Sequence, residues 1–309
     1  MNRTNEPLAR TSLMSVLWDI QKKRRFISRD DMTKIASEFH ISRMELEGVI
    51  SFYHFYHRKH SGKYTIYLNN AIISKHKNYD QVKRAFEKEL GITVGQVTDD
   101  KQFGLFETSC IGLSDQEVSA LINFMPVTDL TPVKVKNLLD KLRDGHIPES
   151  LLKQPKMNIR YTPAPEKTIF FKKYTPGLAL NKLKQSDPIT LIENIKKSKL
   201  SGRGGAFFPT GMKLELCRKN ESDQKYLICN ADEGEPGTFK DRVLMQKHPG
   251  LVIEGMIMAA YAIGASKGFI YLRAEYFYLK DKIQATIDNF YEKGYLGKTK
   301  LDGGDFHFD

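Results

Sequence analysis

Residues 226–242 read YLICNADEGEPGTFKDR, and this stretch decides the fold class of the second half of the chain. Its apolar beginning predicts a strand over 226–230. An apolar helix over 251–262 and a second strand over 268–272 follow it. Strand, helix and strand in this order predict two parallel strands joined by a right-handed crossover. The sequence therefore predicts an α/β fold with a parallel sheet.

The loops 231–237 and 273–276 each follow one of the two predicted strands. Because the carboxyl ends of parallel strands meet at one edge of a sheet, we expect these loops to lie together where ligands bind. The carboxylates of the first loop suit hydrogen bonds from the hydroxyls of a sugar or ribityl chain. Metal binding by Asp232, Glu233 and Glu235 and a solvated acidic turn are the alternative interpretations.

A glycine-rich segment, GRGGAFFPTGMK at 202–213, precedes the acidic loop. Glycines let backbone N–H groups approach an anion, and a helix beginning near Gly211 adds the positive end of its dipole. The predicted phosphate cradle consists of Gly202, Arg203, Gly204, Gly205 and Lys213. No Gly-Lys-Ser/Thr ends it, so it is not a Walker loop, and its spacing differs from the dinucleotide fingerprint. A glycine-rich turn packed against a neighbour is the alternative.

The first half of the chain predicts two smaller parts. Ser12, Ser28 and Ser42 are candidate caps for three helices, which form a helical bundle. From Lys63 the pattern changes to strand, helix, strand and helix, which is typical of a small α/β domain. Five prolines then mark a linker, and Asp187 caps the next helix. The expected domains are 1–62 (helical bundle), 63–145 (small α/β domain), 146–186 (linker, with one strand at 168–171) and 187–309 (second α/β domain).

Composition narrows the classes of function. The net charge of +11 calls for an anionic partner, but the lysines are dispersed and no nucleic-acid-binding motif accompanies them, so we expect no nucleic-acid binding. No stretch has the apolar length of a membrane span or a signal peptide. Three cysteines without metal-ligand spacing favour a reducing cytoplasm. His54, His57 and His60 have near-helical spacing, and we interpret them as packed aromatic neighbours and not as metal ligands.

The two motifs together resemble a known family. SGRGGAFFPTGMK at 201–213 and NADEGEPGTFKDR at 230–242 are similar to the NADH-binding flavoprotein subunits of respiratory complex I and its relatives. SFYHFYHRKHSGKYTIYLNN at 51–70 and FGLFETSCIGLSDQE at 103–117 resemble their thioredoxin-like [2Fe–2S] partner. A fusion of this kind looks like the α diaphorase subunits of soluble NAD-reducing hydrogenases. The resemblance implies a thioredoxin-like domain at 63–145 and the first part of an FMN-binding domain at 187–309.

The resemblance also implies an activity and its residues. NADH would pass hydride to FMN, as in the NADH:flavin oxidoreductase subunit of a hydrogenase, formate dehydrogenase or complex I-like enzyme. The residues implied to hold FMN are Gly202, Arg203, Gly204, Gly205 and Lys213 on one side and Asn230, Asp232 and Glu233 on the other. Glu235 would face the nicotinamide nucleotide as the catalytic residue, and Phe208 would stack on its adenine. The other subunits of the complex are the implied protein partners.

This sequence departs from the family pattern in several places. Phe207 and Ala274 stand where relatives have glycine. The four positions that hold the [2Fe–2S] cluster in the family are Asn69, Ser74, Cys110 and Ser114. One thiolate cannot hold such a cluster, so we expect no iron–sulfur cluster on this chain and no other metal. The family extends beyond residue 309 with a second glycine-rich segment and a [4Fe–4S] cluster. We therefore keep a second hypothesis, a truncated and inactive remnant that only docks other subunits.

Overall fold

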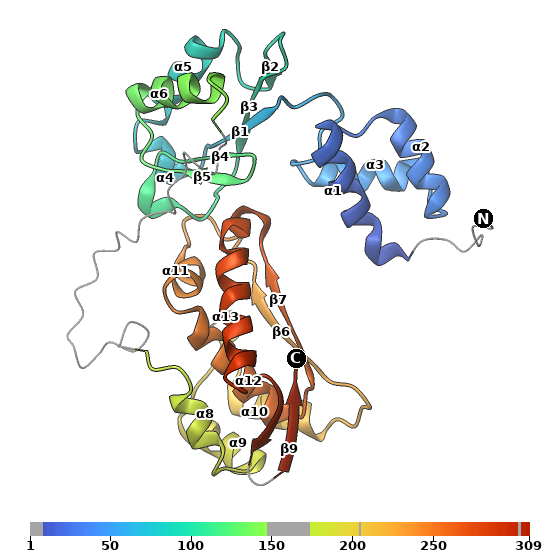
Figure 1. Ribbon diagram of the computed structural model, residues 1–309, viewed down its shortest axis with the longest axis vertical. Coiled ribbons are helices and arrows are strands. Elements are labelled where there is room, and N and C mark those ends of the chain that lie inside the picture. The colour runs from blue at the N-terminus through green and yellow to red at the C-terminus, as the bar shows by residue number, and fades with distance from the viewer. Residues whose placement is uncertain (1–8, 147–173, 204, 302–303) are drawn as a thin grey trace. The chain divides into compact units, whose positions relative to one another are not determined.

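The computed structural model describes residues 9–146, 174–203, 205–301 and 304–309 (Figure 1). The chain divides into two compact units, Met1–Lys156 and Met157–Asp309. Within the described ranges no helix combines the length and the apolar character needed to cross a bilayer. The strand expected at 168–171 and the glycine Gly204 lie outside the described residues.

Three helices open the first unit: α1 (Leu13–Arg24), α2 (Arg29–Glu38) and α3 (Arg43–Phe52), after the short 3-10 turn η1 (Arg10–Ser12). Two of the predicted caps are confirmed, because the hydroxyl of Ser28 accepts the Asp31 N–H at 3.1 Å and that of Ser42 accepts the Glu45 N–H at 3.0 Å. The Ser12 hydroxyl instead donates back to the Ala9 carbonyl. The helices enclose an apolar core that includes Leu17, Ile35, Leu46 and Ile50.

A five-stranded mixed sheet forms the rest of the first unit. Its strands, in spatial order, are β2 (Gln96–Val97), β3 (Phe103–Thr108), β1 (Tyr64–Asn69), β4 (Ala120–Ile122) and β5 (Met125–Val127). Strands β1 and β3 are parallel, as the strand–helix–strand pattern predicts. The accompanying helices are α4 (Ile72–Lys75), α5 (Tyr79–Leu90), η2 (Ser114–Gln116) and α6 (Pro132–Arg143). The strands β2, β4 and β5 were not predicted, because they are too short to give a sequence pattern.

Three helices lead into the sheet of the second unit: α8 (Leu178–Leu183), α9 (Pro188–Lys197) and α10 (Thr210–Lys219). The Asp187 cap is confirmed, since its carboxylate accepts the N–H groups of Ile189 and Thr190 at 2.8 and 3.0 Å. Helix α8 lies inside the stretch expected to be a linker. It has only six residues, too few for a helical period to be recognised, yet Leu180 and Leu183 are buried in the core.

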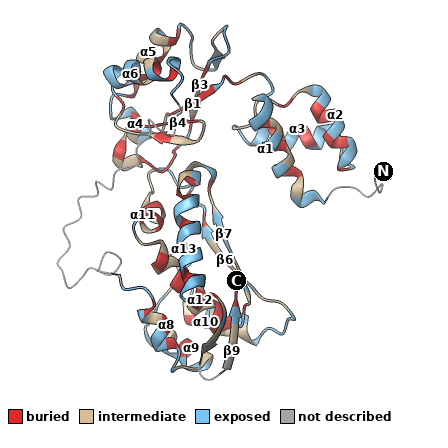
Figure 2. Cartoon of the chain, viewed as in Figure 1, coloured by how far each residue is buried: buried red, intermediate tan, exposed pale blue. Residues whose placement is uncertain are grey.

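Strands β6 (Tyr226–Ala231) and β7 (Lys267–Leu272) are parallel, as predicted. The chain between them forms α11 (Lys240–Lys247) and α12 (Pro249–Ile263), and η4 (Ala274–Leu279) and α13 (Lys280–Glu292) follow β7. A hairpin of β8 (Gly297–Leu301) and β9 (Gly304–Phe308) comes last. Helix α12 covers one face of the β6–β7 pair, and Figure 2 colours the exposed parts of the two strands pale blue. Four residues of the other face are exposed: Tyr226, Ile228, Phe269 and Tyr271.

Candidate functional site

The carboxyl ends of β6 and β7 bring the acidic loop and the segment after β7 together. Asn230 pairs with Tyr271 and Ala231 with Leu272, so both chains leave the sheet at the same edge. The guanidinium of Arg273 donates to the backbone carbonyl of Glu233. The meeting of loops 231–237 and 273–276 that the sequence predicted is thereby confirmed.

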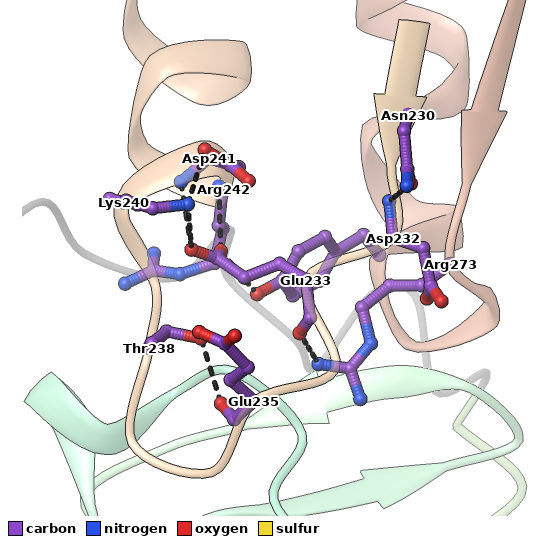
Figure 3. A network of polar contacts seen from close by, with 10 residues as sticks. Asn230, Asp232, Glu233, Glu235, Thr238, Lys240, Asp241, Arg242 and Arg273 are labelled. Carbon is purple, nitrogen blue, oxygen red and sulfur yellow. Dashed lines mark hydrogen bonds and ion pairs between the residues drawn. The ribbon is translucent and has the colours of Figure 1, made fainter. Parts of the chain in front are cut away.

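Glu233 is the anchor of the acidic loop, and its side chain is turned into the protein (Figure 3). Only 4% of the Glu233 surface is exposed to solvent. One carboxylate oxygen accepts the Asp241 N–H at 3.1 Å, and the other accepts the Arg242 N–H at 3.2 Å. The hydroxyl of Tyr276 donates to the second oxygen at 3.0 Å. The carboxylate therefore satisfies the first N–H groups of α11, a helix whose own N-cap residue, Phe239, supplies no side-chain acceptor.

Arg273 and Tyr276 brace this anchor from the segment after β7. Arg273 is buried and forms a bidentate ion pair with Glu275, with N–O distances of 2.6 and 3.0 Å. Burial lowers the pKa of Arg273, but the hydrogen bonds and charge of Glu275 together with the neighbouring Tyr276 outweigh burial, and the pKa is raised. Burial and the nearby Glu233 charge raise the pKa of Tyr276, so its hydroxyl keeps the proton that it donates. Both residues lie at the edge that the sequence predicted, but their bracing role was not predicted.

Asn230, Asp232 and Glu235 lie on the solvent side of the same loop. The Asp232 N–H donates to Asn230 Oδ1 at 3.0 Å, which closes a tight turn directly after β6 (Figure 3). All three residues are exposed. Among the described residues, the carboxylates of Asp232 and Glu235 have no hydrogen-bond or ion-pair partner, so both can accept bonds from a ligand. These acceptors fit the hydroxyls of a ribityl or sugar chain, which donate hydrogen bonds.

The glycine-rich segment forms a narrow loop between α9 and α10. Ser201 and Pro209 form an isolated antiparallel bridge, and the Gly202 N–H donates to the Phe208 carbonyl at 2.9 Å. Gly205 has a φ of +98°, and no atom would meet a Cβ placed on it. The loop therefore leaves open space beside its backbone, as an anion cradle needs. The side chains of Arg203, Phe208 and Lys213 are exposed around it.

Gly211 serves a different purpose from the other glycines. A Cβ at this position would lie 2.8 Å from the backbone nitrogen of Lys196, closer than real Cβ contacts allow. Glycine here permits α10 to begin directly against α9. The helix that starts at Thr210 confirms the predicted helix beginning near Gly211.

Phe207 has a φ of +51°, in the left-handed region that favours glycine. The backbone conformation thus accounts for a glycine at this position in the sequence family that the motif resembles. The Phe207 residue is 60% exposed. More than half of its surface is therefore open to solvent.

The two motifs remain separate in their contacts. Among the described residues, no hydrogen bond or ion pair joins the cradle residues Gly202, Arg203, Gly205 and Lys213, or Phe208, to the acidic loop. That both motifs grip one cofactor stays a prediction. Glu233, which the resemblance placed among the cofactor contacts, instead has both carboxylate oxygens engaged inside the chain.

The four cluster positions that the resemblance implies in the thioredoxin-like part carry one thiol and three other polar groups. Asn69, Ser74 and Cys110 are all buried at the carboxyl edge of the parallel strands β1 and β3, and the Cys110 thiol lies 3.6 Å from the Ser114 hydroxyl. One thiol, two hydroxyls and an amide do not form the four-thiolate set of a [2Fe–2S] cluster. The residues present therefore do not fit that group.

The three histidines near residue 57 are each engaged by protein groups. His54 Nε2 lies 2.8 Å from the Thr108 hydroxyl, and His57 Nε2 lies 2.6 Å from the Tyr67 hydroxyl. His60 Nδ1 accepts the Gly62 N–H at 3.0 Å. Burial and the neighbouring His54 lower the pKa of His57 to about 4, so its ring is neutral at physiological pH. These contacts agree with the interpretation of packed aromatic neighbours.

Comparison with known proteins assigns families to both halves. Residues 2–143 match the thioredoxin-like [2Fe-2S] ferredoxin family, and residues 195–305 match the Nuo51 FMN-binding domain. The chain is 42% identical over 311 residues to the α subunit of the NAD-reducing hydrogenase HoxS of Cupriavidus necator, an alignment that covers 97% of this chain and 52% of the relative. An NADH-quinone oxidoreductase subunit of Rhizobium meliloti is 49% identical over 121 residues, 39% of this chain and 28% of that protein.

A solved structure agrees with these sequence matches. The crystal structure of an NAD+-reducing [NiFe]-hydrogenase in the air-oxidized state superposes with a TM-score of 0.78 and 30% identity, over 91% of this chain and 50% of that chain. The chain thus spans about half the length of the hydrogenase relatives that it matches. The chain therefore contains a thioredoxin-like [2Fe-2S] ferredoxin domain followed by a Nuo51 FMN-binding domain, and over almost its whole length it is similar to the α subunit of an NAD-reducing hydrogenase.

Proposed function

We propose that this chain is the NADH-oxidising, FMN-binding diaphorase subunit of a multi-subunit NAD-linked oxidoreductase. The observation that carries the proposal is the Nuo51 FMN-binding domain match over 195–305, which contains both the glycine-rich loop and the acidic loop. The likeness to the HoxS α subunit over almost the whole chain supports a hydrogenase complex in particular. The other subunits of that complex are the proposed partners, and a reducing cytoplasm is the proposed compartment.

FMN, when bound, supplies the hydride-accepting ring of the reaction. The backbone N–H groups of Gly204 and Gly205 and the charges of Arg203 and Lys213 would hold its phosphate, and Gly202, whose N–H closes the loop on the Phe208 carbonyl, would let the phosphate approach because it has no side chain. Glycine backbones and fixed cations together are the usual protein environment of a phosphate group. The open space beside Gly205 in an exposed loop supports this assignment.

On the other side, Asn230 and Asp232 would accept hydrogen bonds from the ribityl hydroxyls. Their exposed polar groups at the carboxyl edge of β6 support this role. We propose Glu233 as a positioning residue, which acts through the loop and does not contact the cofactor. Its buried carboxylate fixes the turn that carries Asp232.

For NADH, we propose that Glu235 faces the nicotinamide nucleotide and that Phe208 stacks on the adenine. Glu235 has an exposed carboxylate, and its backbone carbonyl accepts the Thr238 N–H at 3.1 Å and the Thr238 hydroxyl at 2.7 Å, which fixes the turn beneath it. Phe208 is 46% exposed, which leaves a ring face for stacking. We further propose that the thioredoxin-like domain carries no cluster, so electrons leave through other parts of the complex.

Titration of the purified full chain with FMN, followed by flavin fluorescence, tests the proposal. We expect saturable binding, and reduction of an artificial acceptor by NADH in the presence of FMN. Asp232→Asn and Lys213→Ala should each weaken FMN binding about tenfold, because each removes one charged hydrogen-bonding group. The matched controls Asp223→Asn and Lys197→Ala change exposed charges outside the residues of both loops. Absence of FMN binding, or controls that weaken it as much as the site variants, would refute the assignment.

A further inference from the structure

The cluster-ligand positions of the thioredoxin-like domain lie on two segments of the chain. Asn69 ends β1, and Ser74 lies in α4 just after it. Cys110 and Ser114 belong to the segment 110–119 that follows β3. Asn69 pairs with Thr108 in the parallel register of β1 and β3, so both segments leave the sheet at one edge. A metal cluster at these four positions would join the two segments covalently.

Glu117 makes the corresponding connection in this chain. It lies on the 110–119 segment, and its Oε1 accepts a hydrogen bond from the side-chain amide of Asn69 across the gap. Its Oε2 accepts the Ser119 N–H at 2.9 Å and the Ser119 hydroxyl at 3.0 Å, which fixes the carboxylate. Asn69 is itself oriented, because its Oδ1 accepts the Ala71 N–H at 3.0 Å. Asn69 and Ser119 are completely buried.

Ser74 is another of the four cluster-ligand positions, and its side chain is not fully accommodated by its surroundings. Its hydroxyl is fully buried and has no hydrogen-bond partner among the described residues, although it lies close enough to Glu117 to favour the charged carboxylate. A buried hydroxyl without a partner is uncommon in a native domain. The pocket is thus only partly refitted for polar side chains. The Asn69 N–H donates to the Ser119 carbonyl at 3.0 Å, and two side-chain bonds add to this backbone link between the segments. The Asn69 amide donates to the Glu117 carboxylate and, at 3.5 Å, to the Ser119 hydroxyl.

We propose that Glu117 is a positioning residue that replaces the metal cluster as the cross-link of this pocket. Its carboxylate joins the end of β1 to the 110–119 segment through Asn69, and a domain without a cluster keeps both segments in place. This inference concerns the first unit of the chain and is independent of the proposed FMN site.

An exchange of roles between the two side chains tests the cross-link. In Glu117→Gln, the new side-chain oxygen can still accept from Ser119, but the new NH2 group faces the NH2 group of Asn69. In Asn69→Asp, two carboxylates face each other. The double variant restores a complementary pair, because the amide at position 117 now donates to the carboxylate at position 69. That carboxylate can still accept the Ala71 N–H. Amide hydrogen exchange of residues 110–119 in the full chain is the readout.

Each single variant should accelerate exchange in 110–119 by about tenfold, and the double variant should return to within about threefold of the original chain. Asp99→Asn, an acid-to-amide change at an exposed position of the same domain, should leave exchange unaltered. Additive effects in the double variant, unaltered exchange in Glu117→Gln, or stoichiometric iron and sulfide in the purified chain would each overturn the proposal. We expect FMN binding to be unchanged in the same variants. An FMN titration therefore distinguishes a failure of the Glu117 proposal from a failure of the proposed FMN site.

Discussion

Replacing Glu233 by glutamine should loosen α11, whereas replacing its neighbour Asp232 by asparagine should not. The Glu233 carboxylate accepts from two backbone N–H groups and from the Tyr276 hydroxyl. Glutamine offers one oxygen, so its NH2 group must face at least one buried donor. An unsatisfied buried donor costs about 1–3 kcal/mol, and the lost charge at the N-terminus of α11 about 0.5–1 kcal/mol more. Asp232 is exposed and its change to asparagine should cost less than about 0.5 kcal/mol.

The assay is amide hydrogen exchange of the peptide that covers α11, in the full chain. A loss of about 2 kcal/mol corresponds to roughly thirtyfold faster exchange through local opening. Glu233→Gln should therefore exchange at least that much faster in α11, with α6 of the first unit as an internal reference. Asp232→Asn should exchange like the original chain and lose FMN affinity. Equal exchange in the two variants would refute the distinction between an anchoring and a ligand-binding acid.

Three further predictions concern other parts of the chain. Gly211→Ala should lower the free energy of unfolding by about 1–3 kcal/mol, because its Cβ meets Lys196. Gly255→Ala, at a helical glycine with open space around it, should raise the free energy of unfolding by about 0.5–1 kcal/mol. Denaturant titration checks both variants, and a Gly211→Ala variant as stable as the original chain would contradict the packing argument. Phe207→Gly should be about 1 kcal/mol more stable than Phe207→Ala, because only glycine adopts the positive φ at this position without strain. Equal stability of the two variants in thermal unfolding would refute this. Burial raises the pKa of Glu117 to about 7, against hydrogen bonds from Ser119 and Asn69 that lower it. The native state then holds this proton more tightly than the unfolded chain, so stability should fall by up to about 3 kcal/mol as pH rises from about 4.5 through 7, and Glu117→Gln should remove this slope in denaturation midpoints.

Long apolar runs and capping residues carried most of the fold prediction. Strands β6 and β7 are continuous runs, and the helix between them is longer than a strand can be, so parallel pairing through a helical crossover was the expected arrangement. The Asp187 and Ser28 caps are local, three residues from the groups they bind. Such signals can be seen in a sequence because both partners lie within one turn.

What the sequence could not supply is contact between distant residues. The cap of α11 comes from Glu233, seven residues before the helix begins, and the helix has no capping residue of its own. For this reason α11 was not predicted, and all the acids of the loop were assigned a ligand-binding role. One signal was available, namely a helix start at Lys240 without an adjacent Ser, Thr, Asp or Asn at the cap position, preceded by several acids. A helix of that kind requires an acceptor from elsewhere in the chain.

Glu233 and Glu117 show how this chain separates structural acids from functional ones. Glu233 and Glu117 each accept hydrogen bonds on both carboxylate oxygens, and each bonds to residues that lie several positions away along the chain. Asp232 and Glu235 lie one and two residues from Glu233, yet their carboxylates are exposed without partners among the described residues. An exposed, unpartnered carboxylate contributes little to folding, so it can be directed towards a ligand without loss of stability. The proposed cofactor and substrate contacts, Asp232 and Glu235, are therefore acids that folding does not require. The turn that presents them depends on Glu233, the acid of this loop that folding does require.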